Sequence, residues 1–264
     1  MLNALIETIF VKPWNAIVKF YHLMGSPPSF YKISGYFLPW LLILSLVLTA
    51  IGLYDGLVLA SPDYQQGYSA RIMYVHVPSA WMSMFVYFVM AIAGVITLVW
   101  RMKISEAVMM ASAPIGAWFT LITLLTGSLW GKPMWGTWWE WDARMTSELL
   151  LLFIYIGIMA IYTAFSEDHR KAARLAALVT VVGVFNLVII HYSVKWWSSL
   201  HQGTTISLTG DSKITWDMAR PLISMAFATK FYYGYSMLKR ARMHVLEVES
   251  QKKWVEQELN GEQS

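Results

Sequence analysis

Cysteine is absent from this sequence of 264 residues. The chain therefore forms no disulfide bond, holds no metal through thiolates and makes no covalent thioether bond to a prosthetic group. Any metal must be held by histidine, aspartate, glutamate or methionine side chains. Because the chain has only six histidines, the candidates for metal binding are few.

Charged residues are also scarce. They make up 14% of the chain, against about 25% in soluble domains, whereas 57% of the residues are hydrophobic and the mean hydropathy is +0.47. These values predict an all-α integral membrane protein, with residues 1–264 forming one domain. The net charge of +4 is small and the basic residues form no continuous stripe, which excludes nucleic acid as a partner and leaves membrane lipid as the surrounding medium.

Six apolar runs are long enough to cross a bilayer as helices. They lie at residues 37–53, 79–100, 107–129, 149–165, 175–194 and 221–238. The preceding segment, residues 1–36, is polar and aromatic, is broken by Pro27 and Pro28, and lacks the apolar core of a signal peptide. We expect this segment to lie on the cytoplasmic membrane surface.

Lysine and arginine are distributed unevenly between the segments that join these spans. Thirteen fall on one side, in segments 1–36, 101–106, 166–174 and the tail 239–264, whereas six fall on the other side. The excess of positive charge predicts that both termini are cytoplasmic. The three longer loops, at about 54–78, 130–148 and 195–220, then face the periplasm.

Lys230 lies within the last predicted span. The aromatic residues that follow it, from Phe231 to Tyr235, are typical of a membrane interface. We therefore expect Lys230 to lie about one turn inside the cytoplasmic boundary and to extend its ammonium group towards the lipid headgroups.

The loop at residues 130–148, here called the tryptophan loop, contains five tryptophans between Trp130 and Thr146. An ordinary interfacial belt needs only one or two per helix end. The excess predicts a shelf for a wide, flat, apolar ligand. The alternative is an amphipathic helix that rests on lipid. The residues expected to form the shelf are Trp130, Trp135, Trp138, Trp139, Trp141 and Asp142.

Two local patterns predict the conformation of this loop. Thr137 and Glu140 have the spacing of a capping box, which predicts a helix from Trp138 with Glu140 paired to Arg144. Glycine and proline at positions 131, 133 and 136 predict a break before it, so that the first two tryptophans form a separate flap.

The histidines indicate which ligand the shelf holds. His76, His191 and His201 are close to the periplasmic side, and two imidazoles beside clustered tryptophans favour axial ligation of a haem iron. If the chain stays helical, the ten residues between His191 and His201 separate them by about 15 Å, so both cannot approach one iron. We expect His201, which follows two tryptophans, to face His76, and His191 to contact a neighbouring helix. The other three, His22, His169 and His244, are expected to be solvated.

The quoted segments resemble one known family. The pattern W-G-x-x-x-W-x-x-W-W-x-W-D-x-R-x-T at 130–146 is similar to the WWD signature of haem-handling proteins in cytochrome c biogenesis. SPDYQQG at 61–67, RIMYVHVPSAW at 71–81 and IIHYSVKWWSSLHQG at 189–203 narrow the resemblance to the CcmC family.

The resemblance implies a bacterial inner-membrane protein that holds haem b non-covalently at the periplasmic face, between His76 and His201. It also implies delivery of this haem to the periplasmic chaperone CcmE, in a complex with the one-span subunit CcmD and the ABC transporter subunits CcmA and CcmB. Haem propionates need cations, and Arg71 and Arg144 are the candidates. Asp142 is expected to orient an arginine or a tryptophan N–H, or equally to lie at a helix N-terminus.

Three other functions are less consistent with the sequence. A haem lyase that attaches haem to apocytochrome c shares the tryptophan motif, but such enzymes are larger and contain a further haem within the bundle. An electron-carrying b-type subunit would place its histidines at mid-depth. A self-powered exporter needs a phosphate-binding loop, and the segment 127–132 has the wrong glycine spacing and ends before Pro133. We therefore expect a protein that is not an enzyme.

Overall fold

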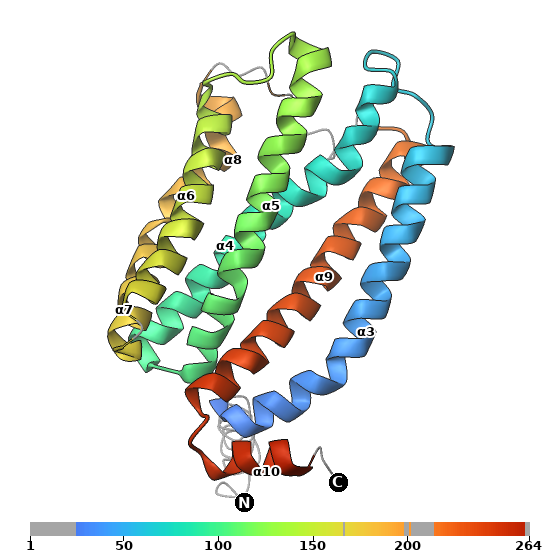
Figure 1. Cartoon of the computed structure of the whole chain (residues 1–264). Helices are drawn as coiled ribbons and strands as arrows, with labels where there is room; N and C mark the ends of the chain where they lie inside the picture. Colours follow the sequence, from blue (N-terminus) through green and yellow to red (C-terminus); the bar gives the residue numbers. More distant parts are fainter. Residues whose placement is uncertain (1–24, 166, 198–200, 202–213, 262–264) are drawn as a thin grey trace, which may run out of the picture.

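A computed structural model describes residues 25–165, 167–197, 201 and 214–261. These residues form an antiparallel bundle of long helices (Figure 1), which confirms the predicted all-α class. In chain order the elements are α3 (Pro27–Tyr54) with a π-helical extension η2 (Asp55–Leu59), a 3-10 turn η3 (Tyr68–Ile72), α4 (Met73–Trp100), α5 (Lys103–Trp135), α6 (Ala143–Ala164), α7 (His169–Val182), α8 (Val184–Trp196), α9 (Trp216–Val248) and α10 (Lys253–Gly261).

Five helical segments are long and apolar enough to cross a membrane. They are Pro27–Leu59, Tyr68–Trp100, Lys103–Trp135, Ala143–Ala164 and His169–Trp196. The last combines α7 and α8, and Gly183 separates the two helices. The sixth expected span corresponds to α9, which is 33 residues long but more polar than the other five.

The helices extend beyond the apolar runs. For example, α4 begins at Met73 and α6 at Ala143, six residues before the corresponding runs. Of the expected N-terminal interfacial segment, residues 1–24 lie outside the described part, and residues 27–36 form the first turns of α3, which begins at Pro27. Proline is favourable at this position because the N–H groups of the first helical turn have no partner within the helix. The N–H that proline lacks therefore costs no hydrogen bond.

The predicted flap in the tryptophan loop is wrong. Helix α5 continues through Gly131 and Pro133 to Trp135, and it ends at Gly136, whose φ of 76° lies in the left-handed region that glycine adopts without strain. Trp130 and Trp135 therefore lie on the last turns of a rigid helix.

The predicted capping box is wrong as well. Helix α6 begins at Ala143 and not at residue 138, and its N-cap is Asp142. The Thr137 hydroxyl instead donates a hydrogen bond to the carbonyl oxygen of Trp139 at 2.8 Å. Glu140 precedes the helix and is exposed, so the expected pairing with Arg144 along one helix does not occur.

The bundle has two parts. Four helices, α4 to α7, surround a core in which Tyr87 and Tyr155 are fully buried and meet edge to face at a centroid distance of 5.3 Å. Helices α3 and α9 form a second, antiparallel pair (Figure 1), and α9 joins this pair to α4 and α5. Helix α3 has few contacts other than those with α9 and η2.

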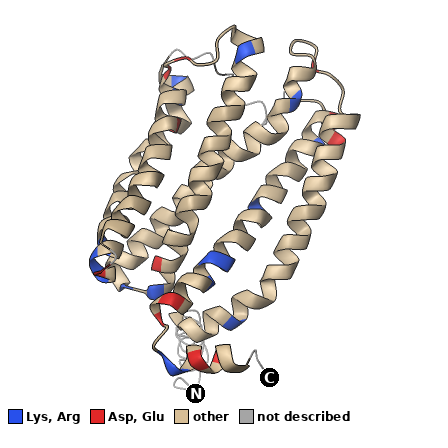
Figure 2. Ribbon diagram, in the orientation of Figure 1, with Lys and Arg blue, Asp and Glu red and all other residues tan. Residues whose placement is uncertain are grey.

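Charged residues gather at the two ends of the bundle, although blue segments also occur along α9 (Figure 2). We call the end where α5 gives way to α6 the tryptophan end, and the opposite end, where α9 runs into α10, the tail end. At the tail end α10 lies against the start of α3, where the Trp254 and Tyr31 rings are 6.0 Å apart. The Lys32 ammonium and Glu258 carboxylate also lie 3.8 Å apart there.

Candidate functional site

His76 lies in the first turn of α4 at the tryptophan end and is half-buried. Its Nδ1 is 3.0 Å from the Thr126 hydroxyl of α5. The ring approaches the backbone of α5 closely at Gly127, because a Cβ atom there would lie 3.0 Å from His76 Cε1. The Trp130 ring meets the imidazole edge to face at a centroid distance of 5.6 Å.

The hydrogen bonds around Thr126 determine the tautomer of His76. The Thr126 hydroxyl donates its proton to the Ile122 carbonyl oxygen at 2.6 Å, so its oxygen accepts from His76. Nδ1 of His76 therefore carries the proton, and Nε2 has a free lone pair. An imidazole held in this way is a ready ligand for a metal through Nε2.

His201 is held in an equivalent way by Asp142. Its Nδ1 lies 3.0 Å from Asp142 Oδ2, and because a carboxylate only accepts, Nδ1 carries the proton. The other oxygen of Asp142, Oδ1, accepts the backbone N–H of Met145 at 2.8 Å. A carboxylate that orients an imidazole is a common outer partner of metal-binding histidines.

The charge state of His201 suits a metal ligand. Burial lowers the pKa of the imidazole, and the neighbouring Arg144 guanidinium lowers it further, while Asp142 raises it without compensating fully. The imidazole is therefore neutral at pH 7, as ligation requires. His76 and His201 are close enough to interact electrostatically.

The tryptophans lie in two settings. Trp130 and Trp135 each lie beside one of the two histidines, since the Trp135 and His201 rings are 4.9 Å apart. Trp138 and Trp141 are instead largely exposed, at 55% and 74%. Trp139 is half-buried, and its ring centre lies 5.3 Å from that of Trp141.

Two buried hydrogen-bond donors at this end have no partner in the described part of the chain. They are Nε of Arg71 and Nε1 of Trp139. An unsatisfied buried donor costs about 1–3 kcal/mol. A carboxylate can accept a hydrogen bond from either donor, and Arg144, which interacts electrostatically with Asp142 and Glu148, adds a further cation. The donors present thus fit a flat apolar ligand with carboxylate groups.

His191 differs from the other two histidines. It lies on α8 with an exposed side chain and contacts the ring of the adjacent Tyr192 at 4.7 Å. The expected contact with a neighbouring helix is therefore wrong. Residues 202–213, which follow His201 in the third predicted loop, lie outside the described part of the chain, as does His22.

Two residues of the site were not predicted. Thr126 supports His76, and the Gln66 side chain accepts a hydrogen bond from Trp130 Nε1 at 2.9 Å. Gln66 belongs to the quoted segment 61–67, whereas Thr126 lies in an apolar run without any local signal. Asp142 combines the expected helix N-terminus with an unexpected histidine partner.

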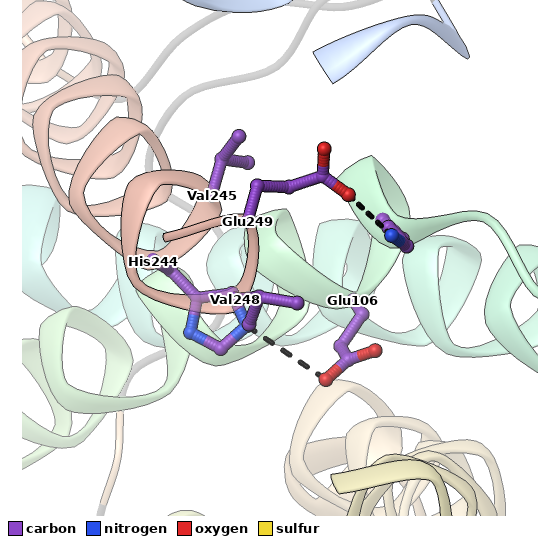
Figure 3. Close-up of a pocket in the computed structure, with 6 residues that line it drawn as sticks. Glu106, His244, Val245, Val248 and Glu249 are labelled. Carbon is purple, nitrogen blue, oxygen red and sulfur yellow. Dashed lines mark hydrogen bonds and ion pairs between the residues drawn. The ribbon is translucent and has the colours of Figure 1, made fainter. Parts of the chain in front are cut away.

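A second group of titratable residues lies at the tail end (Figure 3). His244 of α9 is 3.7 Å from the Glu106 carboxylate of α5 and 3.3 Å from the Tyr162 hydroxyl of α6. The prediction that His244 is solvated is therefore wrong. Lys103 and Glu249 form an ion pair beside it, and Trp254 Nε1 donates to Glu249 at 3.0 Å. These contacts join α5, α6 and α9 at one end of the bundle.

The fold and the site define a multi-pass membrane protein in which two oriented imidazoles lie among tryptophans and unsatisfied donors, an arrangement suited to haem. The family model of CcmC, heme exporter protein C, matches residues 20–256. The chain is 49% identical over 234 residues to heme exporter protein C of Escherichia coli strain K12, covering 89% of this chain and 94% of that protein.

Two further relatives extend the comparison. Heme exporter protein C of Haemophilus influenzae is 47% identical over 237 residues, covering 90% of this chain and 96% of its own length. A putative cytochrome c biosynthesis ccmC-like mitochondrial protein of Marchantia polymorpha is 42% identical over 206 residues, covering 78% and 87%. The chain belongs to the CcmC family. It is therefore a haem-handling protein of cytochrome c maturation and not an enzyme.

Proposed function

We propose that this protein binds haem b non-covalently at the tryptophan end, with His76 and His201 as the two axial ligands. The observation that carries this proposal is the shared state of the two imidazoles. Each has its Nδ1 proton engaged, one with Thr126 and one with Asp142, so that each presents Nε2 as a ligand. In both, the Nδ1 contact assigns the unprotonated nitrogen to Nε2, which is the form in which an imidazole ligates iron.

The remaining parts of the haem have partners in the same place. The porphyrin packs on the shelf of Trp130, Trp135, Trp138, Trp139 and Trp141, and such burial contributes several kcal/mol at about 25 cal/mol per Å². The propionates accept from Arg71 Nε and Trp139 Nε1, and Arg144 balances their charge. Asp142 acts on the haem through His201.

We infer that the tryptophan end faces the periplasm of a bacterial inner membrane and that both termini are cytoplasmic. This orientation follows from the excess of lysine and arginine at the tail end. Helix α9 then crosses the membrane as the sixth span, because it runs alongside α3 through the bundle (Figure 1).

The proposed fate of the haem is transfer to the periplasmic chaperone CcmE. Trp138 and Trp141 support this because they are exposed beside the site and provide an apolar docking surface. CcmD and the transporter subunits CcmA and CcmB are the further proposed partners, and the ATPase of this complex, not this chain, would supply the energy that frees the loaded chaperone.

The test is a set of single glycine substitutions read by absorption spectroscopy. His76→Gly and His201→Gly should each lose the spectrum of six-coordinate low-spin haem and regain it when imidazole is added. His191→Gly is the matched control, since this exposed side chain lies on α8, and its spectrum should not change. If His191→Gly lost the low-spin spectrum and regained it with imidazole, while His201→Gly was unaffected, the second axial ligand would be His191 and not His201. Absence of bound haem in the unsubstituted protein would refute the proposal altogether.

A further inference from the structure

Lys230 lies at the middle depth of the bundle and not near its end. Ten residues separate it from Arg220, which pairs with Asp55 at 2.9 Å at the tryptophan end, so the axial separation is about 15 Å. A similar length of α9 separates it from Lys239 and Arg240 towards the tail end. A contact with α3 locates the neighbouring residue Ala228 independently. Its carbonyl oxygen accepts a hydrogen bond from the hydroxyl of Ser45, within α3, at 3.1 Å. Within the bundle, Lys230 therefore lies deeper than the position one turn from the cytoplasmic boundary that the sequence predicted.

The aromatic residues after Lys230 explain the error. Tyr233 is buried in the bundle, where its hydroxyl is 2.9 Å from that of Ser112, and its ring packs on Phe85 at 6.0 Å. Tyr232 contacts the Phe119 ring of α5. Tyr233 thus packs between helices, whereas Tyr232 is 49% exposed, so the run is not a uniformly exposed belt of the kind expected at a membrane interface.

The ammonium group of Lys230 is exposed at this depth and lacks a charged partner. Its Nζ lies 6.0 Å from the centre of the Phe85 ring and 5.6 Å from that of Phe227. Within the described ranges, no carboxylate lies at ion-pair distance from Lys230. A lysine side chain extends about 6 Å, so it cannot reach headgroups about 15 Å away along the helix. A lone cation at the bilayer centre is costly and usually marks a functional contact.

The surface around this cation is apolar and long. Helix α4 exposes Trp81, Phe85, Phe88 and Ile92 at helical spacing, which makes a stripe about 17 Å long. On the adjoining α9, Ile223 and Phe227 are also exposed. Their spacing of seven and three residues from Lys230 places them on the same face of the helix. We call Lys230 and these six residues the lysine face.

We propose that the lysine face binds a transmembrane helix of a different protein, and that this helix carries an aspartate or glutamate at the middle of the membrane. Charge complementarity identifies the occupant: a single anion opposite Lys230 removes the cost of the exposed cation, and a helix covers the apolar stripe along its length. The inference rests on the six-span arrangement proposed above.

A second copy of this chain does not fit. In α3 to α9, every described acidic residue lies within about two turns of a helix end. Glu148, the acid farthest inside α6, is also buried, and Asp55 is already paired with Arg220. No described carboxylate of another copy would therefore meet Lys230 at mid-depth.

The test uses a photoreactive benzoylphenylalanine in place of Phe88, in the full chain in native membranes. It should cross-link to a membrane protein, and Lys230→Met should reduce the yield about tenfold, which corresponds to ~1.4 kcal/mol. Lys230→Arg should retain the cross-link. Replacing the central acidic residue of the captured helix by its amide should reduce the yield as Lys230→Met does. The same probe in place of Val182, an exposed residue of α7, is the matched control and should show no dependence on Lys230.

Three outcomes would overturn the proposal. They are cross-links from position 88 to lipid only, a yield that does not respond to Lys230→Met, and a captured helix without a central acid. The haem site is tested independently by the absorption spectrum, which Lys230→Met should leave unchanged. A Lys230→Cys variant that reacts with a water-soluble maleimide would show that position 230 is not within the membrane, which refutes the sixth span and this proposal together but not the haem site.

Discussion

Asp142 joins the start of α6 to the imidazole of His201. One carboxylate oxygen accepts the Met145 N–H at 2.8 Å and the other lies 3.0 Å from His201 Nδ1. The residue that begins a helix is therefore the same residue that orients a proposed haem ligand. This double role can be divided experimentally, because a hydroxyl side chain can cap a helix without reaching the histidine.

Replacement of Asp142 by serine should keep the helix cap but release His201. Serine is a good N-cap residue, so we expect the stability of the protein to change by less than about 1 kcal/mol. Haem affinity should fall by about 10- to 100-fold, the usual effect of losing an outer partner of a metal ligand. Haem titration followed by absorbance measures the affinity. Asp168→Ser is the matched control, because Asp168 caps α7 through the Lys171 N–H at the tail end. Equal affinity in the two variants would contradict the assigned role.

Replacement of Thr126 by valine should weaken haem binding through His76. Valine preserves the shape of the side chain but removes the acceptor that holds His76 Nδ1–H at 3.0 Å. We expect a loss of about tenfold in affinity by the same mechanism. Thr120→Val, six residues earlier on α5, removes a hydroxyl that donates to the Gly116 carbonyl oxygen, and it should bind haem normally. A similar loss in both variants would indicate damage to α5 itself.

Trp139→Phe should have different effects on the haem-free and the haem-bound protein. In the haem-free protein the substitution removes a buried donor without a partner, which offsets the packing lost with the smaller ring, so that the stability should stay within about 1 kcal/mol of the original. In the haem-bound protein it removes a hydrogen bond to a propionate, and haem should dissociate faster. Thermal unfolding of the haem-free protein measures the first effect, and the rate at which bound haem passes to an excess of a haem-scavenging protein measures the second. The exposed Trp141 provides the control, and an equal dissociation rate in Trp139→Phe and Trp141→Phe would disprove the propionate contact.

The attachment of the tail should weaken at acidic pH. Burial alone would raise the pKa of Glu249, but hydrogen bonds from Lys103 and Trp254 outweigh it and hold this pKa below the ordinary value of 4.5. Because the folded-state pKa is the lower one, the stabilisation is present above pH 4.5 and disappears as the pH falls through the folded-state value. Limited proteolysis after α9, compared at about pH 6 and pH 3, measures this loss. Glu249→Gln should be cleaved readily at both pH values, whereas the exposed Glu247→Gln should behave as the original chain does.

Single cysteines can test the proposed orientation, because the chain contains none of its own. Cysteines at the exposed positions Tyr64 and Glu140 should react with a membrane-impermeant maleimide added to the periplasmic side. Those at His169 and Gln251 should react only after the membrane is opened. Labelling of position 140 only from the cytoplasm would place the tryptophan end on the wrong side and refute the proposed delivery of haem to the periplasm.

Local patterns predicted the parts of this structure that depend on local chemistry. Apolar runs located the five helices that can cross a membrane, because the length and hydropathy of a segment do not depend on its neighbours. The tryptophan motif and the flanking histidines pointed to one end of the bundle, since alternating antiparallel helices bring the segments around His76, Trp135 and Asp142 together.

Long-range contacts decided the parts that were predicted wrongly. Both Thr137 and Asp142 suit an N-cap, and Asp142 also meets His201, which lies 59 residues later in the sequence. His244 is not solvated because its imidazole contacts the side chains of Glu106 and Tyr162, which belong to two other helices. No periodicity or spacing in one sequence shows such meetings. The depth of Lys230 within the bundle was not predicted for the same reason, since Tyr233, which follows it, packs against Ser112 and Phe85 of two other helices.

The pairing of α3 with α9 has a consequence for synthesis of the chain. Helix α3 emerges early, but the helix that it packs against is near the other end of the chain. At about 5–20 residues per second, α3 waits roughly 10–40 s before α9 has been made. During that interval the first span must persist in the bilayer without its final neighbour. Its apolar surface allows this, and assembly of the bundle is complete only when the last long helix returns to the first.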